Sequence, residues 1–190
     1  GAEILEKLKP YHPIIEDILD YRQVAKLKST YTAALTDAAD ENGRIYDKKQ
    51  AKFRQINRFL ELIRDVEDKL PTNKIRICDL CCGKSYLSFA IYYYFTKIKG
   101  MSVQMDCVDL KKDVIKYCSG VAEKLGYSGL NFVCGDINDF KIKRAPDLTV
   151  SLHACDIATD IVLAKGIDSG SRVILSTPAI LRQISFLQRA

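Results

Sequence analysis

Residues 75–85 read IRICDLCCGKS, and this stretch decides the fold. It begins as an apolar run that ends in Asp79, as a buried strand does where it reaches the edge of a parallel sheet. The small residues through Gly83 then predict a tight turn, and a helix is expected to begin at Ser85. A strand, a small-residue turn and a helix in this order let the backbone approach a nucleoside closely.

Acidic residues also end the next two predicted strands. The strand over residues 102–110 contains Asp109 near its end, and the strand over residues 130–136 ends at Asp136. A carboxylate at the end of the second strand can accept hydrogen bonds from both hydroxyls of a ribose. Acids at three successive strand ends are hard to explain by folding alone. We therefore expect Asp79, Asp109 and Asp136 to share one nucleoside-binding site.

Predicted strands and helices alternate along most of the chain. The predicted strands lie at residues 75–82, 102–110, 130–136, 146–153 and 172–177. The predicted helices lie at residues 53–70, from residue 85 onward, and at residues 111–125 and 156–165. This alternation predicts an α/β fold, a Rossmann-like parallel sheet of about five strands covered by helices. We expect two parts, a helical N-terminal extension over residues 1–36 and the Rossmann-like domain over residues 37–190.

Other ligand sites fit these residues less well. A P-loop would need an earlier glycine where Cys78 stands, so this site is excluded. A dinucleotide fingerprint needs the pattern G-x-G-x-x-G, whereas this turn holds only Gly83, so NAD is the less favoured alternative. Cys78 and Cys81 have the CxxC spacing of zinc and redox sites. The second cysteine pair of a structural zinc site is absent from the sequence, so no metal is predicted.

Composition points to a reducing environment. Most of the seven cysteines lie in or beside apolar strands, where a reduced thiol behaves as a small hydrophobic residue. An odd cysteine count without a secretory segment predicts the cytoplasm. The net charge of +5 is only a weak indication of nucleic-acid binding. No apolar run approaches the roughly 20 residues that span a bilayer, so no membrane association is predicted.

Residues 37–178 resemble class I S-adenosylmethionine-dependent methyltransferases. The resemblance rests on the segments KFRQINRFLEL, DLCCGKSYLSFAIYYY, CVDLKKDVI, GDI and SLHACDIATD. It implies S-adenosylmethionine as the cofactor and these cofactor-binding residues: Asp79, Cys81, Gly83, Asp109, Leu110, Asp136 and Ile137. By the resemblance, Asp79 and the turn face the methionine part and Asp109 holds the ribose. Asp136 and Ile137 meet the adenine.

The same resemblance assigns the catalytic role to His153 and Asp156, which occupy the end of the fourth strand, where such enzymes handle the methyl acceptor. The acceptor itself is not identified, and RNA and protein both remain open. Two other classes of function stay open beside the methyltransferase. One is a cofactor- or nucleic-acid-binding module without turnover, and the other is an NAD-dependent oxidoreductase.

The chain departs from the family in three places. Cys81 stands where the family has glycine, and its side chain is expected to crowd the cofactor or to force a backbone angle that glycine adopts freely. The residues PAIL at 178–181 replace a double-cysteine segment. The final helix and antiparallel strand pair of the family are missing, which predicts weak or lost turnover. The strand at residues 172–177 would then be a bare edge, unless the tail or a second copy of the chain covers it.

Residues 1–35 resemble an unrelated family, the thumb region of family A DNA polymerases, through YHPIIEDILDYRQVAKLKSTY. In that family the segment grips the DNA backbone. Basic and acidic residues are equal in number over residues 1–35, so no tight DNA binding is expected here. The abrupt change of family near ENGRIY suggests a recombined or artificial sequence, a chimera without a biological role of its own.

Overall fold

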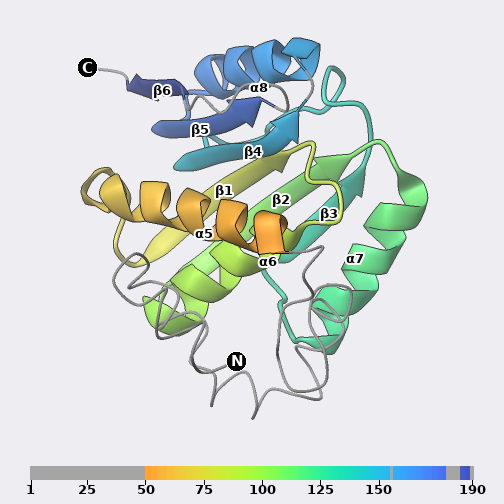
Figure 1. The fold of residues 1–190 in the computed structure, drawn as a ribbon, viewed down its shortest axis with the longest axis horizontal. Helices are drawn as coiled ribbons and strands as arrows, with labels where there is room; N and C mark the ends of the chain where they lie inside the picture. The colour runs from red at the N-terminus through yellow and green to blue at the C-terminus, as the bar shows by residue number, and fades with distance from the viewer. Residues whose placement is uncertain (1–49, 155, 179–184, 189–190) are drawn as a thin grey trace.

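The computed structural model describes residues 50–154, 156–178 and 185–188, and over these the strands and helices alternate as predicted. Helices pack on both faces of one sheet (Figure 1). The strands are β1 Lys74–Leu80, β2 Ser102–Asp109, β3 Leu130–Cys134, β4 Leu148–Ala154, β5 Val173–Pro178 and β6 Ser185–Gln188. The α-helices are α5 Gln50–Asp65, α6 Tyr86–Tyr93, α7 Lys112–Lys124 and α8 Asp156–Asp168. The predicted boundary at residue 36, the extension before it, Cys155 and residues 179–181 lie outside the described residues.

The sheet has the strand order β3-β2-β1-β4-β5-β6. Strands β1 to β5 pair in parallel, and β6 pairs antiparallel to β5. The chain builds outward from β1 to β3 and then returns to the other side of β1 with β4. Strand order therefore reverses between β1 and β4, and the carboxyl ends of these strands are where open α/β sheets bind ligands. The predicted Rossmann-like parallel sheet is confirmed.

Side chains of β1 alternate between two hydrophobic clusters. Ile75 and Ile77 belong to the larger cluster, which includes buried residues of α5, α6 and α7. Cys78 and Leu80 point to the smaller cluster with Val162 of α8. This alternation follows from the two-residue period of a strand, and β1 is buried on both faces over residues 77–80. Full burial of a side chain such as Leu80 contributes about 1.5–3 kcal/mol.

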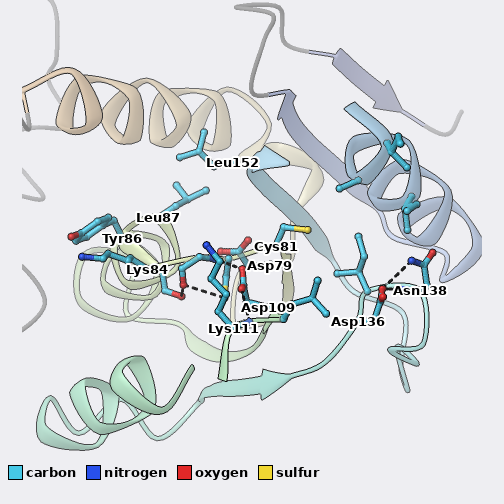
Figure 2. Close-up of a pocket in the computed structure, with 18 residues that line it drawn as sticks. Asp79, Cys81, Lys84, Tyr86, Leu87, Asp109, Lys111, Asp136, Asn138 and Leu152 are labelled. Carbon is cyan, nitrogen blue, oxygen red and sulfur yellow. Dashed lines mark hydrogen bonds between the residues drawn. The ribbon is translucent and has the colours of Figure 1, made fainter. Parts of the chain in front are cut away.

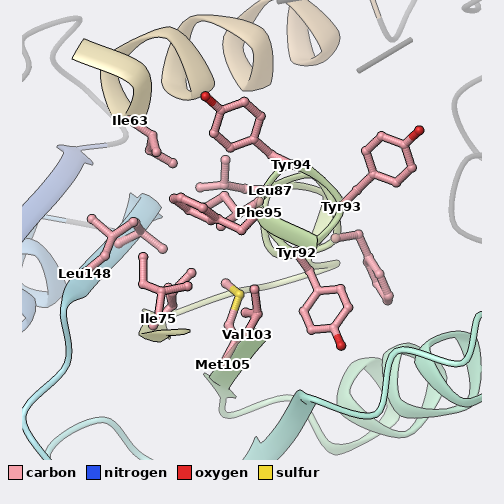
Figure 3. Close-up of a cluster of buried hydrophobic side chains, with 14 of the residues drawn as sticks. Ile63, Ile75, Leu87, Tyr92, Tyr93, Tyr94, Phe95, Val103, Met105 and Leu148 are labelled. Carbon is pink, nitrogen blue, oxygen red and sulfur yellow. The ribbon is translucent and has the colours of Figure 1, made fainter. Parts of the chain in front are cut away.

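Helix α6 is buried on nearly all sides, as its apolar sequence predicts. Tyr92 and Tyr93 of α6 and Tyr94, which directly follows it, are all buried, and Figure 3 shows them projecting in different directions around the helix axis. Side chains from the sheet, including Val103 and Met105 of β2, lie beneath them in the same cluster. The tyrosine run is therefore part of the core, and it fixes the position of α6 and of the turn that precedes it.

The edge of β5 is covered by the chain's own tail. Strand β6 pairs with β5 from Val173↔Gln188 to Ser176↔Ser185. The antiparallel strand pair was expected to be missing, but one antiparallel strand is present, and it covers β5 as the alternative of a covering tail expected. Backbone groups of β5 that a bare edge would expose are paired with β6, so the predicted homo-oligomer loses the bare β5 edge on which it depended.

Element ends differ slightly from prediction where the backbone leaves the extended conformation. Strand β1 stops at Leu80 rather than residue 82, because Cys81 has a φ of +65°. Strand β3 stops at Cys134, before the predicted end at Asp136. No helix within the described ranges is both long and apolar enough to cross a membrane.

Candidate functional site

A cavity of about 730 Å³ lies at the carboxyl ends of β1, β2, β3 and β4 (Figure 2). Its volume falls within the range of about 300–1,000 Å³ typical of small-molecule sites. The turn between β1 and α6 forms one wall. The residues that follow β2 and β3 and the first turns of α8 contribute to the rest. The cavity therefore occupies the position where strand order reverses.

All seven residues predicted to bind the cofactor line this cavity. They are Asp79, Cys81, Gly83, Asp109, Leu110, Asp136 and Ile137. Their convergence follows from the sheet, because β3, β2 and β1 are neighbours and parallel, so their carboxyl ends meet at one edge. Whether these residues hold a cofactor remains a prediction.

The turn after β1 has an unusual backbone. Cys81, Gly83 and Ser85 have φ values of +65°, +53° and +57°. Only glycine adopts such angles without steric cost, so two non-glycine residues here are strained by about 1–2 kcal/mol each. The backbone amide of Cys82 donates to Val108 O at 3.0 Å, which ties the turn to β2. The angle at Cys81 agrees with the glycine-like conformation expected from the sequence.

Asp109 joins the turn to the end of β2. Its Oδ2 accepts a hydrogen bond from the Gly83 amide at 2.8 Å, and its Oδ1 accepts one from the Lys111 amide at 3.0 Å. These two donors fix the orientation of the carboxylate beside the cavity. Each carboxylate oxygen has a second lone pair, so both remain able to accept a hydrogen bond from a ligand hydroxyl.

Asp79 is nearly enclosed, with 1% of its surface exposed, although it borders the cavity. The Ser88 hydroxyl of α6 donates to its Oδ2 at 2.5 Å. Burial first, and the nearby Asp79 carboxylate second, raise the pKa values of the Cys78, Cys82 and Cys107 thiols well above the ordinary range. These thiols are therefore protonated near neutral pH, as packed neutral groups are.

The cysteines show neither a disulfide nor a metal cluster where the structure describes them. Cys78 and Cys81 form no disulfide, and among the described residues no three His, Cys, Asp or Glu side chains are grouped so that they could hold a metal ion. Cys78 lies in β1 with its side chain in the smaller cluster, whereas Cys81 lines the cavity. The CxxC spacing therefore reflects a strand that continues into a turn.

Asp136 organises the loop that follows β3. Its Oδ1 accepts hydrogen bonds from the Asn138 amide at 2.8 Å and from Asn138 Nδ2 at 2.9 Å. Lys165 Nζ of α8 donates to Asn138 O and to Phe140 O, both at 2.9 Å. Helix α8 thereby holds the loop at the cavity wall, where Ile137 is buried in the smaller cluster.

The two predicted catalytic residues lie at the junction of β4 and α8. His153 is near the carboxyl end of β4, and α8 begins at Asp156, but the placement of both side chains lies outside the described part of the chain. Their neighbours Leu152 and Ile157 line the cavity. The register between β4 and β5 shifts at His153, between Leu152 and Ala154. Such irregularities are common next to active sites, where they redirect a side chain.

The structure adds lining residues that the sequence reasoning did not assign to the site. They are Cys82, Lys84, Ser85, Tyr86, Leu87, Lys111, Asn138, Leu152, Ile157, Ala158 and Ile161. Two large apolar side chains at the cavity, Leu110 and Ile157, are 67% and 76% exposed. A usable signal was present, because Leu110, Ile137 and Ile157 each directly follow an acid at or just beyond a strand end. Exposed apolar side chains at a cavity favour a ligand with a flat apolar part.

A family model described as a methyltransferase domain matches residues 51–184. The chain belongs to this methyltransferase domain family. The match confirms the class I S-adenosylmethionine-dependent methyltransferase family that the sequence resemblance predicted. S-adenosylmethionine is the cofactor of that class.

Solved structures share the fold of the methyltransferase domain. A putative sarcosine dimethylglycine methyltransferase from Galdieria sulphuraria is 14% identical with a TM-score of 0.53, and the match covers 68% of this chain and 48% of that one. Coclaurine N-methyltransferase bound to N-methylheliamine and SAH is 11% identical with a TM-score of 0.50, covering 64% of this chain and 35% of that one. At such identities the likeness concerns the fold alone.

Part of the methyltransferase chain also resembles DNA polymerase I. The enzyme of Streptococcus pneumoniae strain TIGR4 is 41% identical over 59 residues, which are 31% of this chain and 7% of the polymerase. The thermostable enzyme of Thermus aquaticus is 54% identical over 37 residues, 20% of this chain and 4% of the polymerase. The chain thus spans only a small part of the curated relatives it matches. This partial likeness agrees with the resemblance to two unrelated families.

Proposed function

We propose that the chain binds S-adenosylmethionine in the cavity at the ends of β1, β2 and β3 and transfers its methyl group to an acceptor beside the end of β4. One observation carries the proposal: acids at or just beyond the carboxyl ends of three neighbouring strands line a single cavity of about 730 Å³. The acceptor is an unidentified RNA, protein or smaller molecule. The cofactor supplies a methyl group activated by attachment to a positively charged sulfur.

The charges and shape of the cavity fit this cofactor. Carboxylates of Asp79, Asp109 and Asp136 border the cavity, and negative charge favours a ligand that carries a sulfonium and an ammonium group. A Cβ atom built on Gly83 would meet nothing within 4 Å, so the turn backbone faces open space that a ligand can approach. The apolar side chains Leu110 and Ile137 suit a flat base.

Each strand end has its own role in this proposal. Asp109, held by the Gly83 and Lys111 amides, accepts hydrogen bonds from the ribose hydroxyls. Asp136 and Ile137 contact the adenine. Asp79 and the turn after β1 form the wall beside the methionine part.

His153 and Asp156 act on the acceptor in this proposal. They hold its nucleophilic atom in line with the methyl group, and the His153 imidazole can take up the proton that the acceptor loses. Most of the rate enhancement would come from alignment, which can supply several kcal/mol without a covalent intermediate. The β4 irregularity at His153 supports a functional role for this position.

The test is calorimetric titration of the protein with S-adenosylhomocysteine. Asp109→Ala should weaken binding by about 1.5–3 kcal/mol, roughly 10- to 150-fold, because a charged acceptor is lost. Asp106→Asn is the matched control, since Asp106 lies on the same strand, is exposed and bonds Asn131 instead of the cavity. Equal affinity of wild type and Asp109→Ala would remove the ribose assignment. A thermal shift with NAD and none with S-adenosylhomocysteine would favour an oxidoreductase.

A cofactor-binding module without turnover is the second candidate. The observation that favours it is Cys81, whose side chain lines the cavity at a position where the family has glycine. Incubation with methyl-labelled cofactor and separate RNA and protein fractions distinguishes the two functions. Labelling of one species that requires His153 would establish turnover, whereas binding without labelling would favour the module.

A further inference from the structure

The cavity has a direction that the strand order sets. Asp136 follows β3, Asp109 is the last residue of β2 and Asp79 lies near the end of β1, and these three strands are successive neighbours in the sheet. Neighbouring strands lie about 4.8 Å apart, so this row of acids extends over roughly 10 Å. A nucleoside with its base at Asp136 and its ribose at Asp109 therefore extends its remaining part toward Asp79 and the turn after β1.

Lys84 stands at that end of the cavity. It lies in the turn between β1 and α6, is exposed, and lines the cavity together with Tyr86. Figure 2 shows Lys84 and Tyr86 on the side of the cavity opposite Asp136 and Asn138. The position of the turn is constrained by the hydrogen bond that the Cys82 amide donates to Val108 O of β2.

The cationic residues of the cavity lie at two different positions along the row. Among the described residues, the cavity lining contains two of them, Lys84 and Lys111. Lys111 follows β2, and its backbone amide binds Asp109, so it belongs to the ribose position. Lys84 is the lysine of the turn after β1. The methionine part of the cofactor carries a carboxylate, which would meet Asp79 and Asp109 unfavourably without a nearby cation.

We propose that Lys84 binds the amino acid carboxylate of S-adenosylmethionine and makes the cavity selective for the intact amino acid over its decarboxylated form. This rests on the proposed function, because it assumes the orientation in which the base lies at Asp136 and the ribose at Asp109. A flexible lysine ammonium with three donors suits a carboxylate that approaches from the cavity mouth. Lys84 is then a specificity-determining residue.

The test compares two ligands that differ only in the carboxylate, S-adenosylhomocysteine and decarboxylated S-adenosylhomocysteine. Calorimetry gives the dissociation constant of each ligand, and the ratio compared is that of the decarboxylated ligand divided by that of S-adenosylhomocysteine. It is measured for wild type, Lys84→Met, Lys84→Arg and Lys111→Met. Lys84→Met should weaken S-adenosylhomocysteine about tenfold, the factor that about 1.4 kcal/mol produces, and leave the decarboxylated ligand nearly unchanged. Lys84→Arg should keep most of the wild-type ratio. Lys111→Met removes an equal charge from the ribose position and should leave the ratio unchanged.

The outcomes separate this inference from the proposed function. If wild type binds S-adenosylhomocysteine and Lys84→Met keeps the wild-type ratio, the inference is wrong while the cofactor site stands. A ratio that falls as much in Lys111→Met as in Lys84→Met also overturns it, since the general field of the cavity would then be responsible. If wild type binds neither ligand, the proposed function and the inference that rests on it are both wrong. Thermal unfolding of each variant checks that the fold is kept.

Discussion

Replacing Cys81 tests the strained turn that forms the cavity wall. Cys81→Gly and Cys81→Ala both remove the thiol, but only glycine adopts the observed φ of +65° without a clash between Cβ and backbone. The left-handed conformation costs about 1–2 kcal/mol for a residue with a Cβ. Glycine also makes the unfolded chain more flexible, which costs about 0.4–1 kcal/mol. The glycine variant should therefore be more stable than the alanine variant by about 0.5–1 kcal/mol.

Urea unfolding of the two variants measures this difference, which corresponds to about 1–4 °C in melting temperature for a chain of this size. The matched control pair is Cys118→Gly and Cys118→Ala, because Cys118 lies in the middle of helix α7. There alanine should be the more stable variant by about 1 kcal/mol. The sign of the glycine-minus-alanine difference thus reverses between the two sites.

Cofactor affinity gives a second readout at the same position. Cys81 lines the cavity, so Cys81→Gly should bind S-adenosylhomocysteine more tightly than wild type does. If the Cys81→Ala variant is as stable as the Cys81→Gly variant, or more stable, the argument from backbone strain is wrong. Unchanged or weaker affinity in Cys81→Gly would show that the cavity accommodates the thiol.

Further predictions concern the thiols, the sheet edge and the N-terminal segment. Burial raises the pKa of Cys107 well above its ordinary range, so the unfolded chain loses this proton above a pH of about 8.5 while the folded chain keeps it. Stability should be independent of this thiol below that pH and fall above it, by up to about 1.4 kcal/mol per pH unit, and Cys107→Ala should reduce the slope in urea unfolding between pH 7.5 and 9.5. Deletion of residues 185–190 removes β6 and should lower stability and promote self-association through the bare β5 edge, which sedimentation velocity detects. Residues 1–35, with balanced charge, should not confer submicromolar binding to primer-template DNA, and fluorescence anisotropy at physiological salt with and without them tests this.

The β1–turn–α6 unit could be predicted because its signals are local. An apolar run, an acid and a small-residue turn follow one another within residues 75–85, and each restricts the backbone directly. The meeting of Asp79, Asp109 and Asp136 in one place also followed, since parallel strands end at a common edge. The exact strand ends were less predictable. Strand β1 ends at Leu80 because Cys81 has a positive φ, a conformation that cysteine rarely adopts.

The sequence by itself determined the parallel α/β sheet and the strand ends that carry acids, because strand and helix periodicities and turn residues act over a few neighbouring positions. The family followed from the resemblance of several sequence segments taken together. Tertiary structure alone decided that β6 covers β5, since nothing local in residues 185–188 states which strand they pair with. It also decided that Ile157 of α8 and Lys111 line the same cavity. These residues are far apart in the chain, and the distance between them depends on how α8 packs against the loop after β3. Lys165 of α8 holds this loop to the helix through its hydrogen bonds to Asn138 O and Phe140 O.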